Sequence, residues 1–374
     1  MIHQPSVEAA LREELGRWPD ATLNSLWEFQ SYDEDADGLS VEFSTPEGAR
    51  TIRARYLVGA DGARSPVRQA LGVGQHDLGF EEPWLVIDTI VHDASRLPDV
   101  NIQICDPARP TTCVLMGEGR HRWEFMILPG EDPDIVSSDA SIAELLKPWD
   151  VEGAVTLERK AVYTFRARIA ERWRKGRVLL AGDAAHQTPP FAGQGMGSGL
   201  RDAANLAWKL TAVTRDGAPD TLLDSYQPER EPNLRATIDM AVMMGRTVCI
   251  TDPAAAAMRD QQMLAARAAG QSPDGPLEYP PISEGIILNG SPGAGSYFPQ
   301  PCAGEARLDD ALGAGQWLIT RAMLDDAKLA PFRPGLADWL DAQRAEAVLV
   351  RPDRYVFGTG GADDLARAWA EAVG

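Results

Sequence analysis

The feature that most constrains this chain is a short apolar strand that ends in a carboxylate and leads into a glycine-rich turn. The apolar run Val178–Ala181 is typical of a buried parallel strand, and Gly182–Asp183 follows it directly. After a proline pair, every second residue from Gly193 to Gly199 is a glycine. A helix is then predicted from apolar residues at helical spacing: Leu200, Ala203, Ala204, Ala207 and Leu210. This order predicts an α/β unit that brings backbone N–H groups to an electron-rich ligand.

A second strand, turn and helix of the same kind is predicted earlier in the chain. Tyr56–Val58 is a short apolar run, and Asp61–Gly62 lies just beyond its end. Ser65 is suited to cap the next helix, Pro66 fits its first turn, and Gly72 is suited to end it. In each of the two segments a carboxylate therefore follows the end of a short apolar strand.

A third segment, HQPSVEAALREEL near the start, predicts a helix that has Val7, Leu11 and Leu15 on one face. The three segments together resemble the FAD-dependent aromatic hydroxylases. Within that family, CDPARP, RWEFMILPGED and VLVRPDRYVFGTG look like the middle and C-terminal segments of the 3-(3-hydroxyphenyl)propionate hydroxylase group. The resemblance covers nearly the whole chain.

The resemblance implies FAD and NAD(P)H as cofactors, with O2 and a small aromatic substrate as partners. The implied reaction is hydroxylation of a phenolic ring through a flavin C4a-hydroperoxide, with the protein supplying binding, orientation and a dry site. The residues that match the flavin-binding positions of the family are Gln4, Asp61, Gly62, Arg64, Gly182, Asp183, Ala184, Pro190, Gly193, Gly195, Met196 and Gly197. No catalytic or substrate-binding residue is singled out, although Arg109, Arg166 and Arg168 are candidates for a substrate carboxylate.

The fold class expected from the resemblance is α/β (α+β). It comprises an incomplete FAD-binding Rossmann-like domain, an inserted antiparallel substrate-domain sheet and a thioredoxin-like C-terminal unit without a redox cysteine pair. The expected divisions are FAD-binding parts over 1–74 and 166–270, the substrate sheet over 75–165, a linker over 271–307 and the C-terminal unit over 308–374. One long helical stretch is expected from Tyr226 to about Ala269.

The family's G-x-G-x-x-G turn, which holds the FAD pyrophosphate, has no match in this sequence. Roughly a hundred residues of a βαβαβ half-domain are expected to be missing, either by truncation or in a natural remnant. This chain is therefore expected to hold FAD weakly when it is alone.

Each candidate residue also has a plain structural interpretation. An aspartate after a strand commonly caps a helix, which applies to Asp183 and Asp61 alike, and the case for Asp61 is somewhat weaker because Ser65 already supplies a cap. His186 is equally consistent with packing and with cofactor contact, and a cofactor role is less favoured for Arg68 than for Arg64. The aromatic residues interpreted as either core or pocket wall are Trp123, Tyr163 and Phe165.

Composition excludes several other classes of protein. The net charge is −19, which argues against nucleic acid and anionic membrane surfaces as partners. The 4 cysteines form no C-x-x-C pair, which indicates reduced thiols and a cytoplasmic location. The 5 histidines show no metal-ligand spacing, so no metal is predicted. A homo-oligomer remains open.

Two other functions are consistent with the same segments. A flavin-dependent halogenase would share the flavin motifs, although Phe125 stands where its signature has a second tryptophan. The other alternative is a truncated, non-catalytic paralogue that acts as a binding or assembly module.

Overall fold

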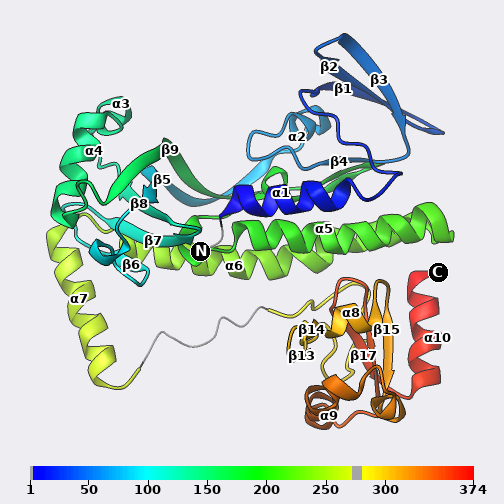
Figure 1. Cartoon of the computed structure of the whole chain (residues 1–374). Coiled ribbons are helices and arrows are strands. Elements are labelled where there is room, and N and C mark those ends of the chain that lie inside the picture. The colour runs from blue at the N-terminus through cyan, green and yellow to red at the C-terminus, as the bar shows by residue number, and fades with distance from the viewer. Residues whose placement is uncertain (1–2, 272–279) are drawn as a thin grey trace.

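The computed structural model describes residues 3–271 and 280–374 of the chain. Its N-terminal part begins with helix α1 (Gln4–Leu15) and continues into a three-stranded antiparallel sheet of β1 (Glu28–Asp35), β2 (Gly38–Thr45) and β3 (Gly48–Ala54). Figure 1 shows this sheet at the opposite end of the molecule from the sheet that contains β5 (Gln75–Val91) and β9 (Val155–Ala170). The face of α1 predicted to be apolar is open to solvent, because Leu11 is 54% and Leu15 36% exposed.

The two predicted strands pair with one another in a small parallel unit. β4 (Leu57–Gly59) lies beside β11 (Val178–Leu180), with Leu57 opposite Val178, and β10 (Arg174–Lys175) completes the sheet. The helix predicted after β4 is confirmed as α2 (Pro66–Leu71), which ends at Gly72 in a left-handed conformation. Because parallel strands end at the same edge, the two strand-end turns come together.

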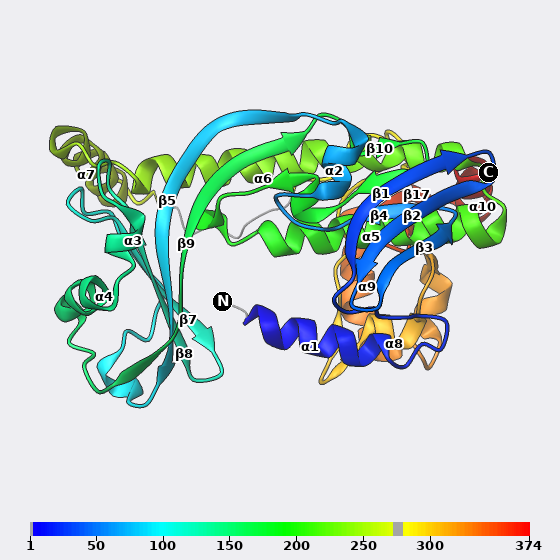
Figure 2. The ribbon, with the colours of Figure 1, turned by 90° about the horizontal axis from the view of Figure 1, so that it is seen from above.

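The middle of the chain forms a six-stranded antiparallel sheet in the order β12-β9-β5-β8-β7-β6. Its strands are β5 (Gln75–Val91), β6 (Ile102–Ile104), β7 (Thr111–Gly117), β8 (Arg120–Met126), β9 (Val155–Ala170) and β12 (His186–Gln187). The long strands β5 and β9 curve from the parallel unit to the far end of the sheet (Figure 2). One face, which carries Leu85, Ile87 and Trp123, forms a core with Val136 of α3 (Pro133–Val136) and Ile142 of α4 (Asp139–Leu146).

Two long helices, α5 (Gly195–Thr211) and α6 (Tyr226–Val248), pack side by side along the molecule (Figure 1). The prediction of one continuous helical stretch from Tyr226 to about Ala269 is wrong, because two helices cover this range. The chain breaks after α6 and restarts as α7 (Pro253–Ala268), where the Asp252 side chain accepts a hydrogen bond from Ala255 N. An Asp-Pro pair favours a new helix start over continuation, because Asp caps and Pro fits only the first turn.

The buried face of α5 is not the predicted one. Leu200 is 46% exposed, and Ala203, Ala204 and Ala207 are exposed as well. The buried side chains are instead Ser198, Asp202, Asn205, Leu206 and Lys209. The prediction failed because it assumed an apolar partner. The charges of this polar face are instead paired with charges on α6, and Asn205 donates a hydrogen bond to Asp353 of the C-terminal unit. Paired charges can be buried.

The C-terminal unit has its own core around a three-stranded antiparallel sheet, β15 (Trp317–Thr320), β16 (Ala347–Val350) and β17 (Val356–Gly360). The elements around it are β13 (Cys302–Ala303), β14 (Ala306–Arg307), α8 (Leu308–Leu312), α9 (Arg333–Ala342) and α10 (Ala362–Val373). Part of the predicted linker lies outside the described residues, and the thioredoxin-like assignment stays a prediction.

The unit is fixed to the long helices by a buried ionic group. Arg351 Nη2 donates to Glu229 Oε2 on α6 at 2.6 Å and to Asp353 Oδ2 at 2.7 Å, and Lys209 Nζ of α5 donates to the same Glu229 oxygen at 2.8 Å. Trp208 also packs against Trp369 of α10. Among the residues that the structure describes, no helix is both long and apolar enough to cross a membrane.

Candidate cofactor site

The turns that follow β4 and β11 are joined by one buried arginine. Arg68 Nη1 donates to the carbonyl oxygen of Ala184 at 2.8 Å, and its Nη2 donates to that of Ala63 at 2.9 Å. The side chain is 6% exposed, and burial lowers its pKa. Arg68 therefore positions the two turns against each other rather than reaching out to a ligand.

The Asp61 carboxylate is occupied by the helix that follows it. One oxygen accepts a hydrogen bond from Ser65 Oγ at 2.5 Å, and the other accepts one from Val67 N at 3.0 Å. Ser65 Oγ in turn accepts from Arg68 N at 2.9 Å. The structural interpretation of Asp61 is thus supported: it caps α2 together with Ser65.

The Asp183 carboxylate has no such partner. It lies in the 3-10 turn η3 (Gly182–Ala184), whose start has no side-chain cap. No described residue donates a hydrogen bond to it, and its side chain is exposed. Surrounding protein still removes enough water to raise its pKa, an effect that His186 opposes. Asp183 is therefore not a helix cap, and its oxygens are available to a ligand.

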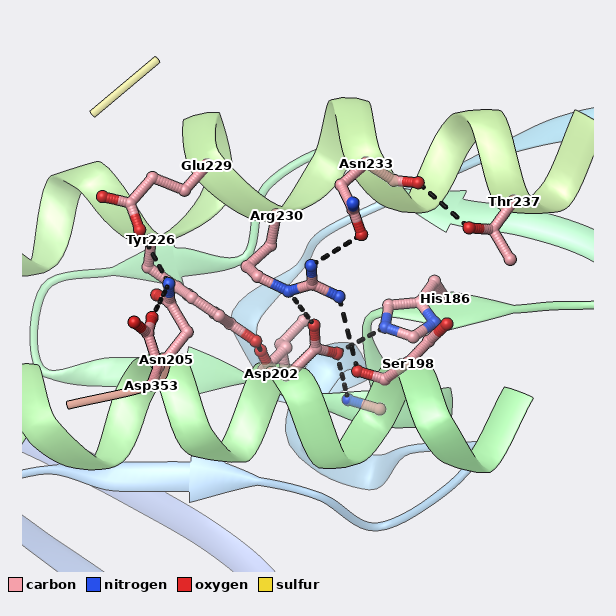
Figure 3. A network of polar contacts seen from close by, with 12 residues as sticks. His186, Ser198, Asp202, Asn205, Tyr226, Glu229, Arg230, Asn233, Thr237 and Asp353 are labelled. Carbon is pink, nitrogen blue, oxygen red and sulfur yellow. Dashed lines mark hydrogen bonds and ion pairs between the residues drawn. The ribbon is translucent and has the colours of Figure 1, made fainter. Parts of the chain in front are cut away.

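A different aspartate, Asp202 of α5, holds the Asp183 turn (Figure 3). Its Oδ2 accepts hydrogen bonds from Gly182 N at 3.1 Å and from His186 Nε2 at 2.5 Å, while its Oδ1 accepts one from Arg230 Nε at 2.9 Å. Asp202 and Arg230 are both fully buried. Burial alone would raise the pKa of Asp202, but the charges and hydrogen bonds of His186 and Arg230 outweigh it, and the pKa is lowered.

The structure favours packing over cofactor contact for His186. The ring is 1% exposed and is bonded to Asp202, and it packs on Trp173 with 5.3 Å between ring centroids. In the described part of the chain its Nδ1 has no hydrogen-bond partner. His186 therefore supports the turn from inside the core.

The alternating glycines do not form the expected loop. Gly195, Gly197 and Gly199 lie in the first turns of α5, and only Gly193 precedes the helix, with φ +64°. A Cβ at Gly199 would lie 3.4 Å from Gly182 Cα, so this glycine brings α5 close to the Asp183 turn. The loop prediction was wrong because a run of small residues is compatible with a helix that packs closely.

Other glycines at the start of α5 leave space for a ligand. A Cβ added at Gly193 or Gly195 would meet no atom within 4 Å. No side chain caps the start of this helix, so the first backbone N–H groups lack partners within the helix. Pro190 and Met196 are half-buried beside this opening. The Asp183 carboxylate and a bare helix start thus belong to one continuous segment.

Two residues predicted to contact the flavin, Gln4 and Arg64, make no contact with other described residues that places them at a flavin site. Gln4 begins α1, which contacts the β7–β8 turn where Ser6 Oγ donates to Glu118 Oε2 at 2.7 Å. No contact in the described structure joins Gln4 to the two strand-end turns. Arg64 is exposed, and its carbonyl accepts a hydrogen bond from Gln69 Nε2. Their proposed flavin contacts therefore rest on family position alone.

The three candidate arginines for a substrate carboxylate are already paired with acidic side chains. Arg109 donates through both Nη atoms to Glu131, at 2.6 Å each. Arg166 pairs with Glu81, and Arg168 pairs with Asp77 and Glu81. A substrate would have to compete with these carboxylates, so the geometry favours none of the three.

An aromatic group that was not predicted from the sequence links the six-stranded sheet to the segment that contains Asp183. Phe191, in the short turn between Asp183 and Gly193, packs on Trp84 of β5 with 5.7 Å between centroids and on Phe165 of β9 with 6.0 Å. Trp84 and Phe165 stack at 5.8 Å. The only signal in the sequence was the aromatic character of each residue, since the three lie far apart along the chain.

Comparison with known proteins identifies the family. A family model described as an FAD binding domain matches residues 1–241, and one described as the HcaD C-terminal domain matches residues 332–373. A probable NADH-specific resorcinol 4-hydroxylase of Rhodococcus jostii (strain RHA1) is 39% identical, over 100% of this chain and 75% of that protein. A 3-(3-hydroxy-phenyl)propionate/3-hydroxycinnamic acid hydroxylase of Mycolicibacterium smegmatis is 38% identical, over 83% of this chain and 58% of that protein.

Solved structures show the same fold. The flavin-dependent monooxygenase PieE, in complex with FAD and substrate, aligns with a TM-score of 0.77 at 24% identity, over 98% of this chain and 79% of that one. The p-nitrophenol 4-monooxygenase PnpA of Pseudomonas putida DLL-E4 aligns with a TM-score of 0.62 at 28% identity, over 71% and 68% of the respective chains.

Fold and family match together define an FAD-binding protein whose parallel unit is accompanied by a six-stranded antiparallel sheet. More specifically, the chain belongs to the FAD-dependent aromatic hydroxylases. This confirms the fold class, the FAD cofactor and the monooxygenase class predicted from the sequence. It favours aromatic hydroxylation and argues against the halogenase alternative.

Proposed function

We propose that Asp183 and the start of α5 bind the ribityl chain and ring of FAD. The observation that carries this assignment is that Asp183 accepts no hydrogen bond from the described residues, while Asp202 holds its turn in place. A carboxylate is a strong acceptor for ribityl hydroxyls. The backbone at Gly193 and Gly195 leaves room for a flat ring, since a Cβ added at either glycine would meet no atom within 4 Å. The residues present therefore fit this end of the cofactor.

The other proposed contacts follow from their placement around these two turns. Gly62, Gly182 and Ala184 are turn residues whose backbone shapes the edge where β4 and β11 end. Asp61 contributes by fixing α2, since both of its oxygens are occupied. Gln4 and Arg64 remain proposals from family position, together with the domain divisions, a cytoplasmic location and any homo-oligomer.

The proposed reaction is hydroxylation of a small phenol with O2 and NAD(P)H. Bound FAD would supply reduction by NAD(P)H and activation of O2. The protein would orient the ring and exclude water, which the aromatic group of Trp84, Phe165 and Phe191 supports. Resorcinol and 3-hydroxyphenylpropionate are the first candidates, because relatives bear names of hydroxylases for them.

The activity test measures NAD(P)H oxidation and O2 uptake by the chain with added FAD, in the presence of each phenol. Stimulation by a phenol, with a product heavier by one oxygen atom, is the expected result. Incorporation of chloride or bromide, or turnover of non-aromatic ketones alone, would contradict the assignment.

The binding test is independent of turnover. Riboflavin carries the ring and ribityl chain but no phosphate, so it probes only the contacts proposed for Asp183 and the start of α5. The full chain should quench riboflavin fluorescence saturably. Absence of saturable binding would contradict the proposed site, whatever the activity assays show.

A further inference from the structure

The six-stranded sheet has one face that packs against the segment from Asp183 to Gly195, and this face carries a buried acid, Glu124. In β5 and β8, Trp84 pairs with Met126, Val86 with Glu124 and Asp88 with Arg122. Residues directly opposite each other share a face, and alternate residues along a strand return to it. Glu124 therefore lies on the Trp84 face.

The Trp84 face is the one that meets the Asp183 segment. Trp84 packs on Phe191, which lies between Asp183 and Gly193 in sequence. The opposite face of the sheet is closed, because Leu85 and Trp123 form a core with α3 and α4. A substrate ring held between the Asp183–Gly195 segment and this sheet would contact the same face of the sheet on which Glu124 lies.

The Glu124 side chain is buried without a hydrogen bond. It is 6% exposed, and no described residue donates a hydrogen bond to its carboxylate. The nearest cation is Arg122, whose Nη1 is 3.8 Å from Glu124 Oε1. Arg122 is itself held by Asp88, with Nε to Oδ1 at 2.6 Å. A buried carboxyl that has no hydrogen bond, and only a 3.8 Å ion pair with an arginine already held by Asp88, destabilises the fold, which points to a hydrogen-bond donor from outside the chain.

Other charged groups share this face: Glu82 lies two residues before Trp84 on β5, and Arg120 of β8, opposite Ile90, pairs with Glu158. Tyr163 and Arg159 of β9 pair with Trp84 and Asp88 respectively, so they share the face, and Arg159 lies over the Tyr163 ring. On β7 the residues opposite Glu124 and Arg122 are Thr112 and Val114, which carry no charge. Burial, reinforced by Asp88 and opposed by Arg122, raises the pKa of Glu124 to about 7.

We propose that Glu124 is the group that recognises the phenolic hydroxyl of the substrate, accepting its hydrogen bond and then its proton. This rests on the proposed function. In the transfer the phenolic O–H bond breaks, the proton passes to a Glu124 carboxylate oxygen, and the electron pair stays on the phenolate oxygen. Arg122 lies near enough to balance the negative charge. A ring with phenolate character is richer in electrons and so more reactive toward an electrophilic oxygen.

The test measures resorcinol binding by calorimetry to the full chain saturated with riboflavin, between pH 5.5 and 8.5. Only the ionised carboxylate accepts a charge-assisted hydrogen bond, so affinity should rise about tenfold as pH increases through the pKa of Glu124. Glu124→Gln should bind about tenfold more weakly at pH 8 and lose the pH dependence. Glu158→Gln is the matched control, since Glu158 lies in the same sheet but pairs with Arg120 at the surface, and it should behave like the wild type.

A second variant keeps the test decisive if Glu124→Gln folds poorly. Asp88→Asn removes a like charge and releases Arg122, so the rise in affinity should shift to lower pH. The role of Glu124 would be overturned if the resorcinol affinity of the wild type did not change with pH. It would also be overturned if Glu124→Gln bound resorcinol with the affinity and pH profile of the wild type. Riboflavin binding without any resorcinol binding would overturn it too while leaving the flavin site intact, whereas failure of riboflavin binding would contradict the proposed function itself.

Discussion

The turns after β4 and β11 begin alike, because each follows a parallel strand and each contains a Gly and an Asp. After β4 the aspartate itself holds the turn, since Asp61 accepts from Ser65 and from Val67 N of α2. After β11 the corresponding support comes from Asp202, one helix further on, which accepts from Gly182 N. Because Asp202 holds the turn after β11, the Asp183 carboxylate is free for a ligand, whereas both oxygens of Asp61 are occupied.

The support behind Asp183 is also of a different kind. Asp202 belongs to a fully buried group with Arg230 and His186, whereas Asp61 is exposed at the surface. Buried ion pairs are sensitive to the loss of one member, because the remaining charge is left without compensation. The two turns should therefore respond very differently to the same type of substitution.

The largest expected effect follows from removing the acid that supports the Asp183 turn. Asp202→Ala leaves Arg230 buried without its partner and removes the acceptor of Gly182 N. The free energy of unfolding should fall by about 3–5 kcal/mol, as measured by urea denaturation. A loss below about 1 kcal/mol would show that the turn does not depend on this network.

Removing the acid of the other turn should have a moderate effect on stability. Asp61→Ala leaves Val67 N without its side-chain acceptor, although Ser65 still caps Arg68 N. A loss of about 1–2 kcal/mol in the free energy of unfolding is expected, with riboflavin affinity nearly unchanged. A large loss of riboflavin binding in a variant that stays folded would mean that Asp61 also contacts the ligand.

The smallest expected effect separates stability from binding at the start of α5. Gly195→Ala places a methyl group in open space on a helical residue, so the free chain should gain about 0.5–1 kcal/mol. The same methyl group should hinder a flavin ring that lies on this backbone, so riboflavin should bind more weakly. Increased stability with unchanged riboflavin affinity would show that the flavin ring does not lie on this backbone.

The parts of the fold that depend on local pattern could be predicted from the sequence. The strand at Val178, the α2 helix with its Ser65 cap and its end at Gly72 were all predictable, because cap and turn residues act within a few positions. The position of an aspartate just after each of the two short strands was also predictable, but the parallel pairing of the two strands was not. Which of the two aspartates was free could not be predicted, because that depends on Asp202, a residue on a distant helix.

The buried face of α5 shows the same limit. Apolar spacing suggested Leu200 and Ala203 as the packed residues, but Asp202 and Lys209 are the buried ones. Their partners, Arg230 and Glu229, lie on α6, and only the packing of the two helices pairs them. The aromatic group around Phe191 and the placement of Glu124 depend likewise on sheet register and on contacts between distant segments.

The most direct test of the central claim compares riboflavin binding in Asp183→Ala and Asp61→Ala, with urea denaturation of both variants. Asp183→Ala should bind riboflavin at least about tenfold more weakly, equal to about 1.4 kcal/mol, and should unfold like the wild type because its carboxylate supports nothing within the fold. Asp61→Ala should show the reverse pattern. Native riboflavin affinity in Asp183→Ala, together with a loss of stability the size of a helix cap, would contradict the account.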